Sequence, residues 1–122
     1  MKKILVVDDE KAICDMLQKF LSKRGYEVFV TDNGDDALTI IREKTPHVVL
    51  LDIRMPKTDG VEVLKKIKEE NKEIGVIMIT AVSETAVAEK CMKLGAFDYI
   101  TKPISLDYLE QSLLAKLLDF YK

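Results

Sequence analysis

The stretch VVLLDIRMPKTDG, residues 48–60, decides how the chain is organised. Four apolar residues lead directly into a lone aspartate, Asp52, and a turn signal, Asp59-Gly60, opens the next helical pattern. A short, continuous apolar run bounded by turn residues is typical of a strand that is buried on both faces. An aspartate directly after such a strand needs an explanation, either as a helix cap or as a functional residue.

This arrangement recurs along the chain as an alternation of strands and helices. Short apolar runs predict five strands: ILVV (4–7), VFV (28–30), VVLL (48–51), VIMI (76–79) and the weaker FDYI (97–100). Each run is followed by apolar residues at helical spacing, such as Ile13, Met16 and Leu17 after the first. Strict alternation of this kind predicts a doubly wound α/β sandwich, in which helices cover both faces of a parallel sheet. Ligands bind such sheets beyond the carboxyl ends of the strands.

Length, composition and charge limit the class of protein. The 122 residues suffice for one domain, residues 1–122, and are too few for two. The 19 basic and 21 acidic residues give a net charge of −2, which argues against direct binding of nucleic acid or of a membrane surface. No apolar run approaches the roughly 18 residues of a membrane span. Cys14 and Cys91 lie outside any CxxC motif, so we expect neither a disulfide nor a metal site there, and a cytoplasmic location.

Polar residues follow four of the five predicted strands. They are Asp8, Asp9 and Glu10 after the first, Asp52 after the third, Thr80 after the fourth, and Thr101, Lys102 and Pro103 after the fifth. Each has an ordinary explanation when taken alone, because aspartate caps helices and threonine or Lys-Pro occurs in turns. Their joint occurrence at one edge of the sheet indicates a functional site.

The carboxylates indicate the chemistry of this site. If the first and third strands are neighbours about 4.8 Å apart, Asp8 or Asp9 faces Asp52. Two such charges about 4 Å apart repel by about 4 kcal/mol at a surface-like dielectric, so they need a proton or a cation. Few, hard oxygen ligands that are open to water suit Mg²⁺. We predict that Asp52 is a nucleophile toward phosphorus, that Lys102 neutralises charge on the transferring group, and that Thr80 donates its hydroxyl.

Four motifs together resemble the receiver domains of two-component response regulators. The run DIRMPKTDG matches the D-x-x-M-P-x-x-D-G pattern of that family in every specified position, and VVDDE, ITA and ITKP match its other motifs in order. The resemblance covers Lys2 to about Phe120. It implies a flavodoxin-like three-layer sandwich of five helices and five parallel strands in the order 2-1-3-4-5. It also implies a phosphoacceptor signalling domain, not an enzyme.

The same resemblance implies roles for the acidic residues. Asp52 would accept a phosphoryl group from the phosphohistidine of a partner sensor kinase. Mg²⁺ would be held by Asp9, Asp52 and the backbone carbonyl of Arg54, with Asp8 assisting mainly through water. His47 precedes the third strand, on the side away from the site, so the donor histidine should belong to the partner.

A conformational switch is also implied by the resemblance. Thr80 and Lys102 would contact the phosphoryl oxygens, and the Lys102-Pro103 peptide bond would be cis. Thr80 would move toward the phosphoryl group while Tyr99 turns inward. The surface remodelled would comprise helix four, strand five and helix five, and it would act on an output domain or a downstream protein.

The carboxyl-terminal third of the sequence refines the resemblance. Residues 92–109, MKLGAFDYITKPISLDYL, resemble receivers of sigma-54-type transcription activators. The arginine-rich last helix of winged-helix regulators is absent, which puts their dimer arrangement in doubt and leaves open a homodimer through helices four and five. Arg54 beside the site and the apolar Val82 favour slow hydrolysis of the phosphorylated form.

Three alternatives stay open at this point. A phosphatase of the haloacid dehalogenase type also uses a strand-end aspartate, but it needs a second aspartate two residues on, where Arg54 stands. A flavin or nucleotide module needs a phosphate loop rich in glycine, serine or threonine after the first strand, where this chain has DDEK. A degenerate receiver would serve only as an interaction module, yet all the acceptor-site residues are present.

Overall fold

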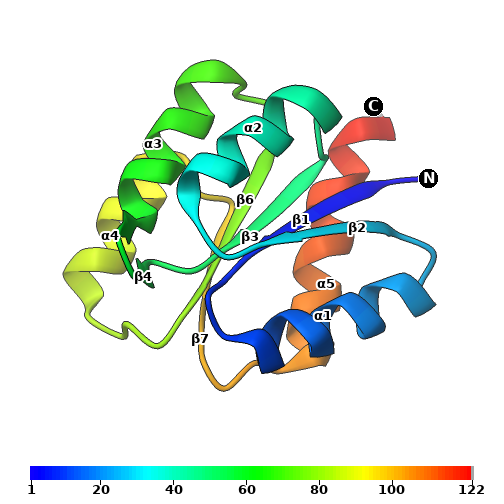
Figure 1. The fold of residues 1–122 in the computed structure, drawn as a ribbon, viewed down its shortest axis with the longest axis horizontal. Coiled ribbons are helices and arrows are strands. Elements are labelled where there is room, and N and C mark those ends of the chain that lie inside the picture. Colours follow the sequence, from blue (N-terminus) through cyan, green and yellow to red (C-terminus); the bar gives the residue numbers. More distant parts are fainter. Residues whose placement is uncertain (122) are drawn as a thin grey trace.

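The computed structural model describes residues 1–121 and shows an α/β sandwich (Figure 1). The last residue of the predicted domain, Lys122, lies outside the described residues. In chain order the elements are β1 (Lys3–Val7), α1 (Lys11–Lys23), β2 (Glu27–Thr31), α2 (Gly34–Lys44), β3 (Val48–Leu51), β4 (Arg54–Met55), β5 (Thr58–Asp59), α3 (Gly60–Glu70), β6 (Gly75–Thr80), α4 (Thr85–Lys93), β7 (Asp98–Thr101), α5 (Leu106–Leu117) and the 3-10 helix η1 (Leu118–Tyr121).

Five parallel strands form the main sheet in the order β2-β1-β3-β6-β7. Since β4 and β5 pair only with each other, this is the predicted order 2-1-3-4-5, which is confirmed. The central strand β3 pairs with β1 on one side and with β6 on the other. Every residue of β3 and β6 is buried, which explains the continuous apolar runs at residues 48–51 and 76–79.

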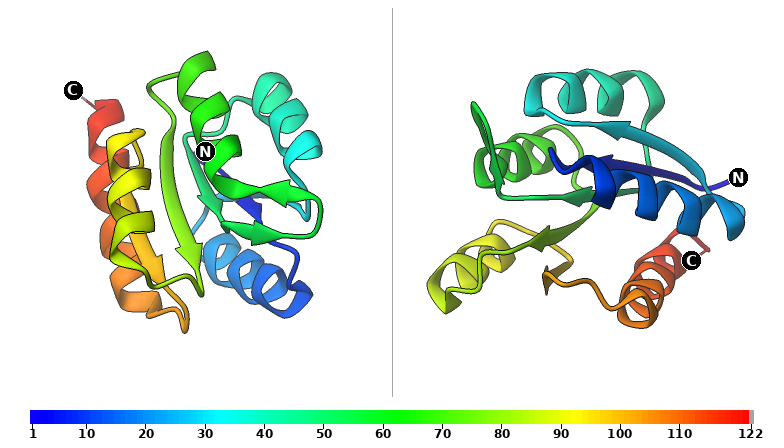
Figure 2. Two further views of the ribbon diagram at one scale, coloured as in Figure 1. Left: turned by 90° about the vertical axis from the view of Figure 1, so that its left-hand side faces the viewer. Right: turned by 60° about the horizontal axis from the view of Figure 1, so that its bottom comes forward.

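Helices cover both faces of the sheet (Figure 2). On one face α1 and α5 bury Leu17, Leu21 and Leu113 against the sheet. On the other face α2, α3 and α4 bury residues such as Leu64 and Cys91. Full burial of one leucine side chain contributes about 1.5–3 kcal/mol, so the two cores together hold the sheet edge rigidly. That edge, formed by the carboxyl ends of the strands, carries the site.

Three local features differ from the sequence-based expectations. The hairpin of β4 and β5 was not predicted, and its turn places Lys57 in the left-handed region with φ 61°. Strand β7 is shifted by one residue from the predicted 97–100. The apolar spacing of Leu106, Leu113 and Phe120 predicts one last helix through Phe120, but α5 ends at Leu117 and Phe120 lies in η1. Among the described residues, the helices are too short or too polar to cross a membrane.

Candidate functional site

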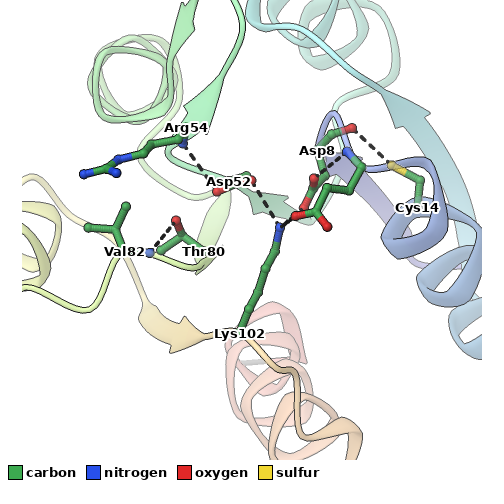
Figure 3. A network of polar contacts seen from close by, with 8 residues as sticks. Asp8, Cys14, Asp52, Arg54, Thr80, Val82 and Lys102 are labelled. Carbon is green, nitrogen blue, oxygen red and sulfur yellow. Dashed lines mark hydrogen bonds and ion pairs between the residues drawn. The ribbon is translucent and has the colours of Figure 1, made fainter.

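The register of β1 and β3 brings two predicted carboxylates together (Figure 3). Val7 pairs with Leu51, so the residues that follow these strands, Asp8 and Asp52, lie side by side at the sheet edge. The ladder continues one bond further, because the Asp52 N–H donates to the Val7 carbonyl at 3.0 Å. Both aspartates are buried. β3 therefore ends on a carboxylate that the sheet holds at its rim.

The remaining predicted residues reach the same edge from β6 and β7. The Lys102 N–H donates to the Thr80 carbonyl at 2.8 Å, which fixes the start of the Lys102 loop beside the end of β6. The Lys102-Pro103 peptide bond is cis, as expected. A shallow cavity at this edge is lined by Asp9, Glu10, Asp52, Arg54, Thr80, Ala81, Val82 and Lys102.

The ammonium group of Lys102 lies among three carboxylates. Its Nζ is 2.9 Å from Asp8 Oδ2, 2.6 Å from Glu10 Oε1 and 3.2 Å from Asp52 Oδ2. One oxygen from each of the three carboxylates lies within 4.8 Å of the others. The side chains of Asp8 and Asp52 are only 4% and 6% exposed, whereas that of Glu10 is 56% exposed. We call these three acids together with Lys102 the rim cluster.

Burial and charge act against each other in the rim cluster. Burial raises the pKa of Asp8, while the hydrogen bond from the Glu10 N–H and the Lys102 ammonium oppose this effect. For Lys102, burial lowers the pKa, but hydrogen bonds to Glu10 and Asp8 and the charges of Asp8 and Asp52 outweigh it, so the pKa is raised. Three carboxylates and one ammonium leave a formal charge of −2, which one divalent cation would neutralise.

Gly60 fixes the loop that carries Asp52. Its N–H donates to the Ile53 carbonyl at 2.8 Å. A Cβ at this position would overlap the Asp52 carbonyl oxygen and lie 2.6 Å from Ile53 Cα, so only glycine allows this approach. The preceding Asp59 caps α3 by accepting from the Val61 N–H at 2.9 Å. The Asp-Gly pair of the opening stretch therefore positions the carboxylate that lies eight residues before the glycine.

The two predicted switch residues meet at one loop residue, Val82. The hydroxyl of the fully buried Thr80 accepts from the Val82 N–H at 3.2 Å. The hydroxyl of the half-buried Tyr99 donates to the Val82 carbonyl at 2.6 Å. Thr80 and Tyr99 are thus linked through the backbone of the loop between β6 and α4.

Asp9 and Arg54 line the cavity beside the rim cluster. Asp9 is exposed and lines the cavity, but the neighbouring carboxylate that completes the rim cluster is Glu10. A part for Asp9 in holding Mg²⁺ stays a prediction. No role was predicted for Glu10, although it follows two aspartates at the end of the first predicted strand. The Arg54 N–H donates to Asp52 Oδ1 at 3.4 Å, and the Arg54 guanidinium extends toward the exposed Glu84, at 3.9 Å.

Comparison with known proteins defines the class of the chain. Residues 4–114 match the family model described as the response regulator receiver domain. The chain therefore belongs to the receiver domains of two-component response regulators, which confirms the family predicted from its motifs. Receiver domains are signalling domains, and they use Mg²⁺ at an acidic pocket; the carboxylates of the rim cluster form such a pocket here.

Individual relatives narrow this class. The chain is 46% identical over 110 residues to the transcriptional regulatory protein ZraR of Klebsiella oxytoca, a match that covers 90% of this chain and 25% of that protein. A two-component response regulator from Clostridium difficile has the same fold, with a TM-score of 0.95, 25% identity and full coverage of both chains. The BeF3-activated receiver domain of RstA from Klebsiella pneumoniae gives a TM-score of 0.89 at 27% identity, over 95% of this chain and 98% of that one. The chain spans about a quarter of the length of the curated relatives it matches.

Proposed function

We propose that residues 1–122 form one receiver domain and that Asp52 accepts a phosphoryl group from the phosphohistidine of a sensor histidine kinase. The observation that carries this proposal is the rim cluster, in which a buried carboxylate lies 3.2 Å from the Lys102 ammonium and beside a second buried carboxylate. In the transfer, an Oδ of Asp52 forms a bond to phosphorus. The bond from phosphorus to the histidine nitrogen breaks, and the nitrogen keeps the electron pair.

The residues of the rim fit a bound Mg²⁺ ion. Carboxylate and carbonyl oxygens are the ligands this ion prefers, and the rim cluster carries a net negative formal charge that favours a cation. We assign Asp8, Asp9, Asp52 and the backbone carbonyl of Arg54 to the ion, which when bound would neutralise charge on the phosphoryl group. Lys102 would contact the phosphoryl oxygens, because its ammonium already lies 3.2 Å from Asp52 Oδ2.

The switch that we infer runs through Val82. If the Thr80 hydroxyl turns toward the phosphoryl group, the Val82 N–H loses its acceptor and the loop has to move. Tyr99, whose hydroxyl donates to the carbonyl of the same residue, then loses its present partner. The surface changed by this motion would comprise α4, β7 and α5. It would contact an output domain, a downstream protein or a second copy of the chain.

Incubation with acetyl phosphate and Mg²⁺, followed by intact mass measurement, tests the acceptor. Wild type should gain one phosphoryl group, and neither Asp52→Asn nor wild type in EDTA should do so. Asp35→Asn, a change of an exposed aspartate in α2, is the matched control and should behave as wild type. A wild type without a mass gain, or an equal gain in Asp52→Asn, would overturn the proposal. Catalytic release of phosphate from phosphomonoesters would favour a phosphatase instead.

A second experiment tests the switch separately from the acceptor. Thr80→Ala should still be phosphorylated on Asp52, because the nucleophile and Lys102 are unchanged. The NMR signals of the Tyr99 ring should shift on phosphorylation in wild type and stay in place in Thr80→Ala. Identical shifts in the two proteins would show that Thr80 does not link the phosphoryl group to Tyr99.

A further inference from the structure

Glu10 contacts the lysine of the rim cluster from the solvent side. The distance of 2.6 Å from its Oε1 to Lys102 Nζ is the shortest of the three contacts that this ammonium makes with carboxylates. The Glu10 side chain is nevertheless 56% exposed, while those of Asp8 and Asp52 are buried. Its backbone is fixed, because the Glu10 N–H donates to Asp8 Oδ1 at 2.9 Å. The side chain alone is therefore free to leave the lysine.

The three contacts use the whole donor capacity of the lysine. An ammonium group has three N–H donors, and those of Lys102 face Asp8, Glu10 and Asp52. A phosphoryl group on Asp52 that binds Lys102 has to replace at least one of these contacts. Moving Asp8 would leave a buried charge without its partner, which is costly, whereas an exposed ion pair contributes little. Of the contacts with Asp8 and Glu10, the one with Glu10 therefore gives way more easily.

We propose that Glu10 competes with the phosphoryl group for Lys102 and thereby sets how strongly the site discriminates between phosphodonors of different charge. This inference rests on the proposed role of Asp52 as the acceptor. Glu10 acts through the position of Lys102 and through its own charge, and it forms no covalent bond. While the donor arrives and Glu10 still contacts Lys102, the Glu10 oxygen and a phosphoryl oxygen on the same ammonium are at most about 5.5 Å apart, the sum of the 2.6 Å contact and one further hydrogen bond of about 2.9 Å. We take about 6 Å as the distance between the two charges.

The size of the effect follows from Coulomb's law. At a water-like dielectric, one unit charge about 6 Å from a dianion changes binding about tenfold, and from a monoanion about threefold. Glu10→Gln keeps the size of the side chain and removes the charge. We therefore expect the second-order rate of phosphorylation to rise about tenfold with acetyl phosphate, a dianion at neutral pH. The rise should be about threefold with phosphoramidate, a monoanion.

The affinity for Mg²⁺ should change in the opposite direction. Removing one negative charge weakens cation binding, so titration calorimetry of the unphosphorylated protein should show weaker Mg²⁺ binding in Glu10→Gln, by up to about tenfold. Phosphorylation rates are accordingly measured at saturating Mg²⁺. Glu43→Gln, a change of an exposed glutamate in α2, is the matched control and should alter neither quantity. If Glu10 had only a structural role, its replacement would not raise the phosphorylation rate while it weakens Mg²⁺ binding.

The outcomes separate this inference from the proposed function. A larger gain with acetyl phosphate than with phosphoramidate, together with weaker Mg²⁺ binding, supports the role of Glu10. Rates equal to wild type, or reduced with both donors, overturn it, since reduced rates would mean that Glu10 holds Lys102 in its productive position. If the wild type itself takes up no phosphoryl group on Asp52, both proposals fail together.

Discussion

Replacing Lys102 with methionine removes the ammonium of the rim cluster and keeps much of the volume of the side chain. Oxygens of Asp8 and Asp52, both buried, then lie within 4.8 Å of each other without that ammonium between them. At an effective dielectric near 20, two unit charges at this distance repel by about 3.5 kcal/mol. Glu10 can turn into water and adds little. We therefore expect Lys102→Met to lose about 3 kcal/mol of stability at pH 7.5.

Urea unfolding with and without Mg²⁺ measures this effect and identifies its cause. In EDTA the variant should show the full loss of stability. Mg²⁺ should stabilise the variant more than wild type, because the ion then offsets the repulsion between Asp8 and Asp52 that Lys102 offsets in wild type. An ion present at a hundred times its Kd contributes about 2.7 kcal/mol, which is enough to offset most of the loss. Lowering the pH should also reduce the loss, since burial raises the pKa of Asp8 and this carboxylate can then bind a proton.

The matched control for this prediction is Lys65→Met, which changes an exposed lysine of α3. It should alter stability by less than about 0.5 kcal/mol and leave the response to Mg²⁺ unchanged. The reasoning would be refuted by a Lys102→Met variant as stable as wild type in EDTA. Equal stabilisation of both proteins by Mg²⁺ would refute it as well, because the charge at the rim would then not be what the lysine neutralises.

Three further substitutions test features outside the rim cluster. Gly60→Ala places a methyl group against the Asp52 carbonyl and 2.6 Å from Ile53 Cα, so urea unfolding should show a loss of about 2–3 kcal/mol; wild-type stability would contradict the close approach. Thr45→Gly relieves a left-handed φ of 47° at the end of α2 and should raise stability by about 1 kcal/mol, seen as a higher Tm; a lower Tm would mean that Thr45 is not strained. Burial, followed by the charge of Lys2, lowers the pKa of His47 from its ordinary 6.5, so its neutral form stabilises the fold above that pH and the contribution is lost as the pH falls through the lowered pKa. The stability advantage of wild type over His47→Gln should therefore shrink between pH 7.5 and 5 in urea unfolding, and a constant difference would count against this role.

The fold could be predicted because burial on both faces leaves a clear record in the sequence. β3 and β6 have no solvent-facing side, so they appear as continuous apolar runs, and the helices between strands keep their own period. The hairpin of β4 and β5 could not be predicted, because strands of two residues show no alternation. The predicted range of the edge strand β7 began one residue too early. Phe97 is apolar yet partly exposed, and the strand begins at Asp98.

The site could be predicted as far as the backbone determines it. Asp8, Asp52, Thr80 and Lys102 were expected at one edge because parallel strands end together, and the register places them there. The part of Glu10 could not be predicted, because its contact with Lys102 joins two long side chains from positions 92 residues apart. The side-chain conformations that allow this contact depend on neighbouring charges. They produce no periodic pattern in the sequence.

If Asp52 is phosphorylated as proposed, the hydrogen bonds at Val82 limit how strongly this change can act on the rest of the domain. The Thr80 and Tyr99 hydroxyls each make one bond to this residue. A hydrogen bond contributes a net 0.5–1.5 kcal/mol, so exchanging both gives about 1–3 kcal/mol of coupling. Coupling of that size corresponds to shifts of about 5- to 150-fold between two conformations. Phosphorylation of Asp52 should therefore shift a population that already exists, because so few bonds are too weak to drive a transition from a negligible minor state.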